Sequence, residues 1–374
     1  MRWNTARTLI AGLCLTGLLA AAQAVAQDDD PMIGEKPLSE LLKQLKSENR
    51  GIQVRAAKVL ADAPAEVRPK MMPKMMVLLK SERENDKFVA AQVLGECGPA
   101  AKAAIPDLLP MLKGTQYERN RAAAAKALGQ ILKDAQPAKD VDEVIDALIS
   151  KISDDYDSYS DVRREVAQAL GMIGTTAKKC IPKMTQVLTQ GSHGLGSTQD
   201  QEYRLVRRAA AWTCSRMGPL AKEHMDLLIS RMHMEGESCP EVVVAIGAIG
   251  PVQANVIPNI IDKIESSGRG GDAGSLKVPA FAALAGFGEK SAAVVPLIRR
   301  ALQGPMWGND AMPIRIAMMK ALPAFGAASK EAAPEILAQI RLGKSQGDEL
   351  SKTLAEEATK AYKAVTGQDP PTGK

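Results

Sequence analysis

The sequence predicts an all-α protein, an α-solenoid (α-α superhelix) of about nine stacked helix pairs. Three observations predict this fold. A two-helix unit recurs along most of the 374 residues, aromatic residues make up only 3% of the chain, and alanine is abundant, which suits closely packed helices. Neither helix of the unit can cover its apolar side chains alone, so the units must stack on one another to form a core.

The most regular copy of the unit spans residues 161–188. Asp161 stands where an N-cap belongs, and Gly174 stands where the chain leaves the helix. Pro182 then lies in the first turn of a second helix, where its missing N–H breaks no hydrogen bond. The first helix carries an apolar stripe at the spacing of one helix face, formed by Val162, Val166, Ala169, Leu170 and Ile173.

Other copies repeat this order of apolar helix, glycine stop and proline start. Pro258, Pro296 and Pro334 are spaced by about 38 residues, within the range of paired-helix solenoids. First helices are expected to begin near Leu38, Met71, Ile105, Val141, Ile181, His224, Ile257, Val295 and Pro334. Second helices are expected to begin near Gln53, Lys87, Arg119, Asp161, Tyr203, Pro240, Lys277, Pro313 and Glu349.

These repeats resemble the HEAT-repeat family, in particular exported HEAT-repeat proteins of the PBS-lyase-HEAT-like kind. The family pattern is an "I-P-x-L-xx-L-L" helix followed by a "D-xx-V-R-xx-A-A-x-A-L-G-x-I-G" helix, and the likeness covers residues 38–367. The resemblance implies an armadillo-type scaffold that binds through its concave face. It does not imply one activity, because unrelated activities use this scaffold.

Residues 1–26 predict a secretory signal peptide. Arg2 and Arg7 precede an apolar run over residues 9–22, and Ala24-Val25-Ala26 forms a small-residue cleavage site. A lipid anchor at Cys14 and an uncleaved anchor are the alternatives. The prediction is therefore an exported protein, periplasmic or extracellular. No stable membrane insertion is expected after cleavage, because no other segment is apolar enough to span.

The mature chain is predicted to have three parts. A flexible acidic leader covers residues 27–37, the repeat array covers residues 38–367, and a disordered tail covers residues 368–374. Loss of the signal peptide removes two of the 48 basic residues and none of the 43 acidic ones. The remaining weak positive charge argues against a nucleic-acid partner.

The sequence contains no arrangement typical of a catalytic, cofactor or metal site. It has only three histidines, with no Ser-His-Asp or Cys-His motif and no CxxC. Methionine-rich segments near Met71 and Met225 suggest copper binding as one interpretation. The spacing of these methionines suits core packing better. The acidic loop before Asp161 lacks the glycine and glutamate of a calcium-binding EF-hand.

The mature cysteines allow two interpretations. Cys97, Cys180, Cys214 and Cys239 each lie in a different repeat. Cys214 takes the place of a core leucine, so a buried free thiol is its simplest role. A Cys214–Cys239 bridge between adjacent repeats is the alternative, because an exported protein can form disulfides.

Four links within helix pairs exceed the length that the repeat needs. They span residues 153–160, 191–202, 266–276 and 304–312, and equivalent links of a solenoid line up along one edge. Loops on a rigid scaffold often carry function, although solenoid turns also vary in length without consequence. The candidate partner-binding residues of these loops are Trp307, Tyr156, Tyr159 and His193.

Arginines recur where second helices begin. Arg163 and Arg207 are further candidates for contacts with an acidic partner, and the resemblance also allows an internal ladder of arginines paired to acids of neighbouring repeats. The predicted function is a non-enzymatic scaffold that binds a protein, or a polymer, without cofactors. The alternatives are an accessory subunit or lyase-like HEAT enzyme, and a structural component of the cell envelope.

Overall fold

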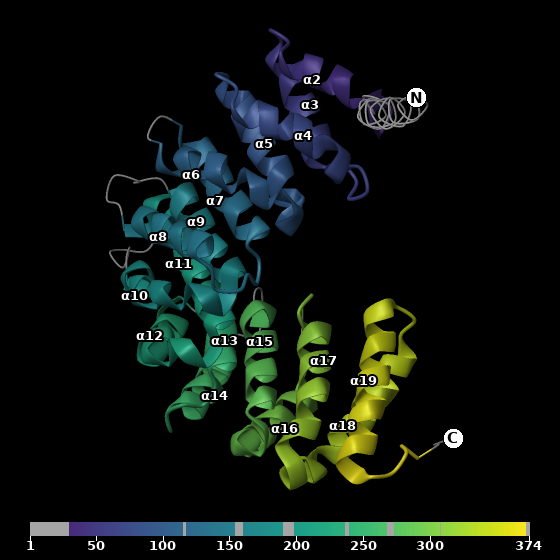
Figure 1. Ribbon diagram of the computed structural model, residues 1–374. Coiled ribbons are helices and arrows are strands. Elements are labelled where there is room, and N and C mark those ends of the chain that lie inside the picture. The colour runs from purple at the N-terminus through teal and green to yellow at the C-terminus, as the bar shows by residue number, and fades with distance from the viewer. Residues whose placement is uncertain are drawn as a thin grey trace, which may run out of the picture. The chain divides into compact units, whose positions relative to one another are not determined.

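The computed structural model describes residues 30–114, 117–153, 160–189, 198–235, 239–267, 273–306 and 308–371, and all nine predicted helix pairs are present in them (Figure 1). This confirms the all-α prediction. The first helices are α2 (Leu38–Leu45), α4 (Arg68–Leu79), α6 (Ile105–Lys113), α8 (Lys139–Ser153), α10 (Ile181–Thr189), α12 (Met225–Glu235), α14 (Val256–Ser266), α16 (Val295–Gln303) and α18 (Ala333–Ser345). The second helices are α3 (Arg50–Ala61), α5 (Glu84–Glu96), α7 (Glu118–Ile131), α9 (Ser160–Ile173), α11 (Thr198–Met217), α13 (Pro240–Ile249), α15 (Ala273–Gly286), α17 (Ala311–Ala321) and α19 (Glu349–Thr366).

Contacts divide the chain into two compact units, one ending at Val93 and one beginning at Leu94. The first unit starts with an antiparallel hairpin of β1 (Met32–Ile33) and β2 (Lys36–Pro37). This hairpin occupies much of the segment predicted as a flexible leader, and Ile33 is buried. The predicted signal peptide lies outside the described residues.

In the second unit, the second helices form a row. Helix α7 packs on α9, α9 on α11, α11 on α13, and this pairwise packing continues through α15 and α17 to α19. The stripe predicted for residues 162–173 is buried, as are Ile181, Met184, Val187 and Leu188 of α10. The core of this unit is therefore built from the apolar stripes that the sequence predicts.

Short 3₁₀ helices replace the simple links expected between one pair and the next. They are η1 (Gly98–Ala104), η2 (Gly174–Cys180), η3 (Gly218–His224), η5 (Gly288–Val294) and η6 (Leu322–Ala332). Gly174, for example, has a φ of 76°, a left-handed conformation that side chains with a Cβ rarely adopt. The glycine stop thus turns the chain into the 3₁₀ helix that leads to the next first helix.

Four of the methionines considered as copper ligands belong to the core, whereas Met234 is 59% exposed. Met71, Met75, Met225 and Met232 are all buried among apolar side chains, where methionine fills irregular gaps. No cluster of three or more histidine, cysteine, aspartate or glutamate side chains that could hold a metal ion occurs among the described residues. Within the same residues, no helix has the length and apolar character needed to cross a bilayer.

Cys97, Cys180, Cys214 and Cys239 are free thiols, so the alternative Cys214–Cys239 bridge is not formed. Burial raises the pKa of Cys180 and of Cys214 to about 12. Since the thiolate is the reactive form, we expect both to resist iodoacetamide at pH 8 in the folded protein and to react within minutes in denaturant. Mass spectrometry of native and denatured samples measures this difference. Rapid labelling of either residue in the native protein would contradict the buried placement.

Candidate binding pocket on the second helices

The structure describes only two of the six predicted site residues. Trp307, Tyr156, Tyr159 and His193 lie outside the described residues. Arg163 and Arg207 lie at the starts of α9 and α11 and are buried, with exposed fractions of 8% and 3%. A partner-binding role for these two arginines stays a prediction, and each has an arginine neighbour that is far more accessible.

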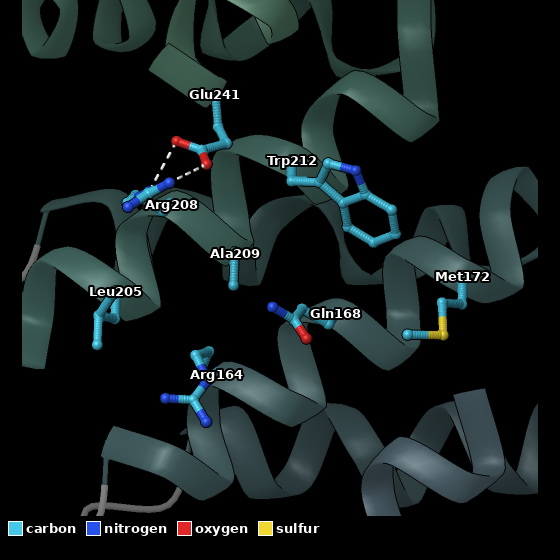
Figure 2. Close-up of a pocket in the computed structure, with 8 residues that line it drawn as sticks. All are labelled: Arg164, Gln168, Met172, Leu205, Arg208, Ala209, Trp212 and Glu241. Carbon is cyan, nitrogen blue, oxygen red and sulfur yellow. Dashed lines mark hydrogen bonds and ion pairs between the residues drawn. The ribbon is translucent and has the colours of Figure 1, made fainter. Parts of the chain in front are cut away.

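Those neighbours, Arg164 and Arg208, line a pocket of about 400 Å³ on α9, α11 and α13. The pocket lies on the outward side of these helices, which is the side that points away from the core. Helix α9 contributes Arg164, Gln168 and Met172, and Figure 2 shows the side chains of α11 lying opposite them. The complete lining is Arg164, Gln168, Met172, Leu205, Arg208, Ala209, Trp212 and Glu241.

The helical period explains why these side chains face outward. In α9 the buried stripe includes Val162 and Val166, so positions two residues after each of them point away from the core. Counted from the glycine stops, Gln168 and Trp212 occupy the same position of successive repeats, and Val244 of α13 occupies it in the next. One register position of three consecutive second helices therefore supplies the surface around the pocket.

Apolar side chains remain exposed on this surface. Leu205 is 42% exposed and Val244 is 44% exposed, and Trp212 is partly exposed. Stacking of neighbouring repeats does not require these side chains, because the core stripes already fill the contact between helices. Exposed apolar side chains that cluster around a pocket are typical of a binding surface.

Trp212 lies over Gly171 of the neighbouring helix. A Cβ at residue 171 would stand 2.5 Å from Cζ3 and 2.8 Å from Cε3 of the indole. Next to it, the Thr213 hydroxyl lies 2.6 Å from the carbonyl oxygen of Ala167 and 2.9 Å from that of Ala209, and its hydrogen bond to Ala167 joins α11 to α9. The indole of Trp212 can therefore pack against α9 because Gly171 has no side chain.

Arg208 is held by Glu241 across the contact between α11 and α13. Its Nε donates to Oε2 at 2.8 Å and its Nη2 donates to Oε1 at 2.6 Å (Figure 2), a bidentate geometry that fixes the guanidinium plane. These hydrogen bonds raise the pKa of Arg208 above its usual value. This contact is the predicted arginine–acid pairing between neighbouring repeats.

Arg164 is held within its own helix instead. Its Nη1 donates to Asp161 Oδ1 at 2.6 Å, and its Nη2 donates to Glu165 Oε1 at 3.1 Å. The pocket is therefore bordered by two arginines whose positions are set by carboxylates. Its lining contains no serine, cysteine or histidine, and both oxygens of its one carboxylate, Glu241, accept from Arg208.

Trp212 was not predicted from the sequence, although a signal for it exists. The unit at residues 161–188 carries a glutamine at the equivalent position, and a tryptophan at an outward position of a repeat is unusual. Aligning the repeats by outward positions, as well as by core positions, would have found it.

Comparison with known proteins agrees with the fold. Residues 105–195 match the family model of HEAT repeats, which confirms the predicted resemblance, and no curated protein matches the chain. Importin beta crystallised in an ammonium sulfate condition is similar over 88% of this chain and 46% of its own, with 13% identity and a TM-score of 0.66. The Kap95:Nup1 complex gives 13% identity, the same 88% of this chain, 45% of that chain and a TM-score of 0.63. Yeast importin-beta (Kap95p) is 12% identical over 88% of this chain and 45% of its own, with a TM-score of 0.61. The chain thus spans less than half the length of these importin structures, and the likeness establishes the HEAT-type α-solenoid fold.

Proposed function

We propose that this protein is a scaffold that binds a protein partner through the outward side of α9, α11 and α13. The observation that carries the proposal is the pocket beside Trp212, with Leu205 exposed in its lining and Val244 exposed one helical turn after the lining residue Glu241. Aromatic and arginine side chains dominate the binding energy of protein interfaces. Here both kinds lie together on a surface that stacking leaves uncovered.

The solved structures of similar fold support a binding role. One of them is a complex between Kap95 and Nup1. In another, with a TM-score of 0.57 and 14% identity, Kap95p binding induces the switch loops of RanGDP to adopt the GTP-bound conformation. These observations concern Kap95. They support the proposal that this chain, whose solenoid fold is similar, also binds other proteins.

The proposal includes export. The basic start, the apolar run over residues 9–22 and the small-residue site at Ala24-Val25-Ala26 support it. The partner would then be a periplasmic or extracellular protein. A polymer of the envelope is the outcome that would replace a protein partner in the experiment below.

Site-specific photocrosslinking tests both parts of the proposal. A benzoylphenylalanine at Val244 is expected to capture a defined partner in intact cells, because this side chain is exposed one helical turn after Glu241 of the pocket. The matched control is the same group at Gln186, an exposed position of the first helix α10. Mass spectrometry identifies the captured molecule and is expected to place the mature N-terminus at Gln27.

Reconstitution with the purified partner then separates specific from accidental capture. A partner that crosslinks at Val244 and not at Gln186, and that binds the purified chain, supports the proposal. Equal capture from both positions, or capture from Gln186 alone, would show that the second-helix surface is not the interface. A protein whose N-terminus remains Met1 would contradict cleavage of the signal peptide.

A further inference from the structure

The floor of the pocket is apolar, whereas its border is rich in hydrogen-bond donors. Met172, Leu205, Ala209 and Trp212 supply the apolar part. A volume of about 400 Å³ has room for one or two side chains of a partner. A bulky aliphatic or aromatic side chain therefore suits the floor.

The two arginines keep donors that no side chain of the described residues uses. A guanidinium has five N–H groups. Arg208 directs its Nε and Nη2 to Glu241, which leaves both N–H groups of Nη1 and one of Nη2. Arg164 uses one N–H group each of Nη1 and Nη2, which leaves the N–H of Nε and one N–H group on each Nη. Arg164 and Arg208 are 29% and 39% exposed, so a partner can reach these donors.

The charged side chains that line the pocket are two arginines and one carboxylate, and this excess of one positive charge decides the sign of the charge that fits. Both oxygens of Glu241 accept from Arg208. Asp161 and Glu165 each accept from Arg164. Glu241 is the one carboxylate of the lining and is paired with Arg208, so an incoming carboxylate adds acceptors to the N–H groups that the two arginines keep.

We propose that the pocket recognises a peptide segment in which a bulky apolar residue is followed by an acidic one. This inference rests on the proposed function and names the partner's chemistry at the same site. The apolar side chain packs against Trp212 and Leu205, and the carboxylate accepts from Arg208 and Arg164. Because Glu241 fixes the guanidinium of Arg208, the donor is in place before the partner arrives.

A second pocket on the first helices provides a contrast within the same unit. It lies between α6 and α8, and its charged residues are Lys113, Asp140 and Glu143. Lys113 is 3.9 Å from Glu143, so Asp140 is left as the excess charge among the three. An acidic peptide is not expected to bind there, and Asp140→Ala is therefore a control that should leave its binding unchanged.

Tryptophan fluorescence provides the test. The chain has three tryptophans, so changing Trp3 and Trp307 to phenylalanine in the full chain leaves Trp212 as the single reporter. Four acetylated and amidated octapeptides, identical except for a central Leu-Glu, Leu-Gln, Leu-Lys or Ser-Glu pair, are titrated against it. The Leu-Glu peptide is expected to change Trp212 emission and to bind about fivefold more tightly than the Leu-Gln peptide, the advantage of a charge-assisted hydrogen bond.

The controls follow from the same contacts. The preference for Leu-Glu over Leu-Gln is expected to shrink in high salt, because both arginines are partly exposed to solvent. It is also expected to disappear in Arg208→Gln, where Glu241 loses its partner and repels an acid. Should that variant unfold, Arg164→Gln supplies the second test, and a thermal melt verifies the fold of each variant.

The possible failures are distinguishable. Tighter binding of the Leu-Lys peptide, or equal binding of Leu-Glu and Leu-Gln, overturns the proposed acidic chemistry while the Val244 crosslink still tests the binding surface. Tight binding of the Ser-Glu peptide overturns the apolar requirement. Loss of both the peptide signal and the Val244 crosslink overturns the proposed function itself.

Discussion

Replacing Gly129 with alanine is expected to destabilise the second unit by about 3 kcal/mol, at the upper end of the usual cost of overpacking. A Cβ at this position of α7 would stand 2.5 Å from the Cα and 2.7 Å from the Cβ of Ala169 in α9. Both atoms are fixed to the backbone of the neighbouring helix, so no rotamer change can remove the clash. The two helices would have to separate and open the core between them. Urea unfolding followed by circular dichroism measures the loss.

Gly286→Ala is the matched control for this substitution. Gly286 is also a helical glycine, at the end of α15, but no atom beyond its chain neighbours and its own helix backbone lies within 4 Å of the position that its Cβ would take. Alanine there is expected to stabilise the protein by about 0.5–1 kcal/mol, because it favours the helix over the unfolded chain. If the two variants unfold at the same urea concentration, the close approach of α7 to α9 is wrong.

The helix pairs could be predicted because their signals are local. The stripe from Val162 to Ile173 and the stop at Gly174 depend only on spacing within one unit, and both occupy the places that the sequence predicts. The 3₁₀ helices that follow the stops were missed, since they depend on which link residues the next pair buries. Ala177, for example, is fully buried, which its sequence neighbours do not reveal.

The candidate site could be predicted only in part, because it depends on helix phase and on stacking. Arg163 and Arg164 are adjacent in sequence, yet a turn of 100° per residue buries the first beside Val162 and leaves the second accessible. The predicted contacts were at Arg163 and Arg207, whose burial leaves little surface for a partner. The pairing of Arg208 with Glu241 joins residues 33 positions apart, and only the stacking of α11 on α13 determines it.

Trp212→Ala is expected to weaken binding of the captured partner about 30-fold, which corresponds to roughly 2 kcal/mol for an interface hot spot. The indole is the largest apolar group that lines the pocket, so its removal takes away most of the surface against which a partner can pack. Isothermal titration calorimetry with the purified partner measures the change. Leu220→Ala is the matched control, because Leu220 is 47% exposed but does not line the pocket. Its affinity for the partner should be unchanged.

Gly171→Ala is the second variant of this test, and it moves the indole without removing it. Gly171 occupies in α9 the repeat position that Gly129 occupies in α7, yet the atoms nearest to its added Cβ belong to the ring of Trp212. A side chain beside an open pocket can swing away, so the loss of stability should be about 1 kcal/mol, the lower end of the cost of overpacking. The displaced ring would occupy the pocket, and the partner's affinity should fall about tenfold, between the wild type and Trp212→Ala. The same substitution at two equivalent glycines thus separates folding from binding. Unchanged affinity in Gly171→Ala, together with unchanged affinity in Trp212→Ala, would place the interface away from this pocket.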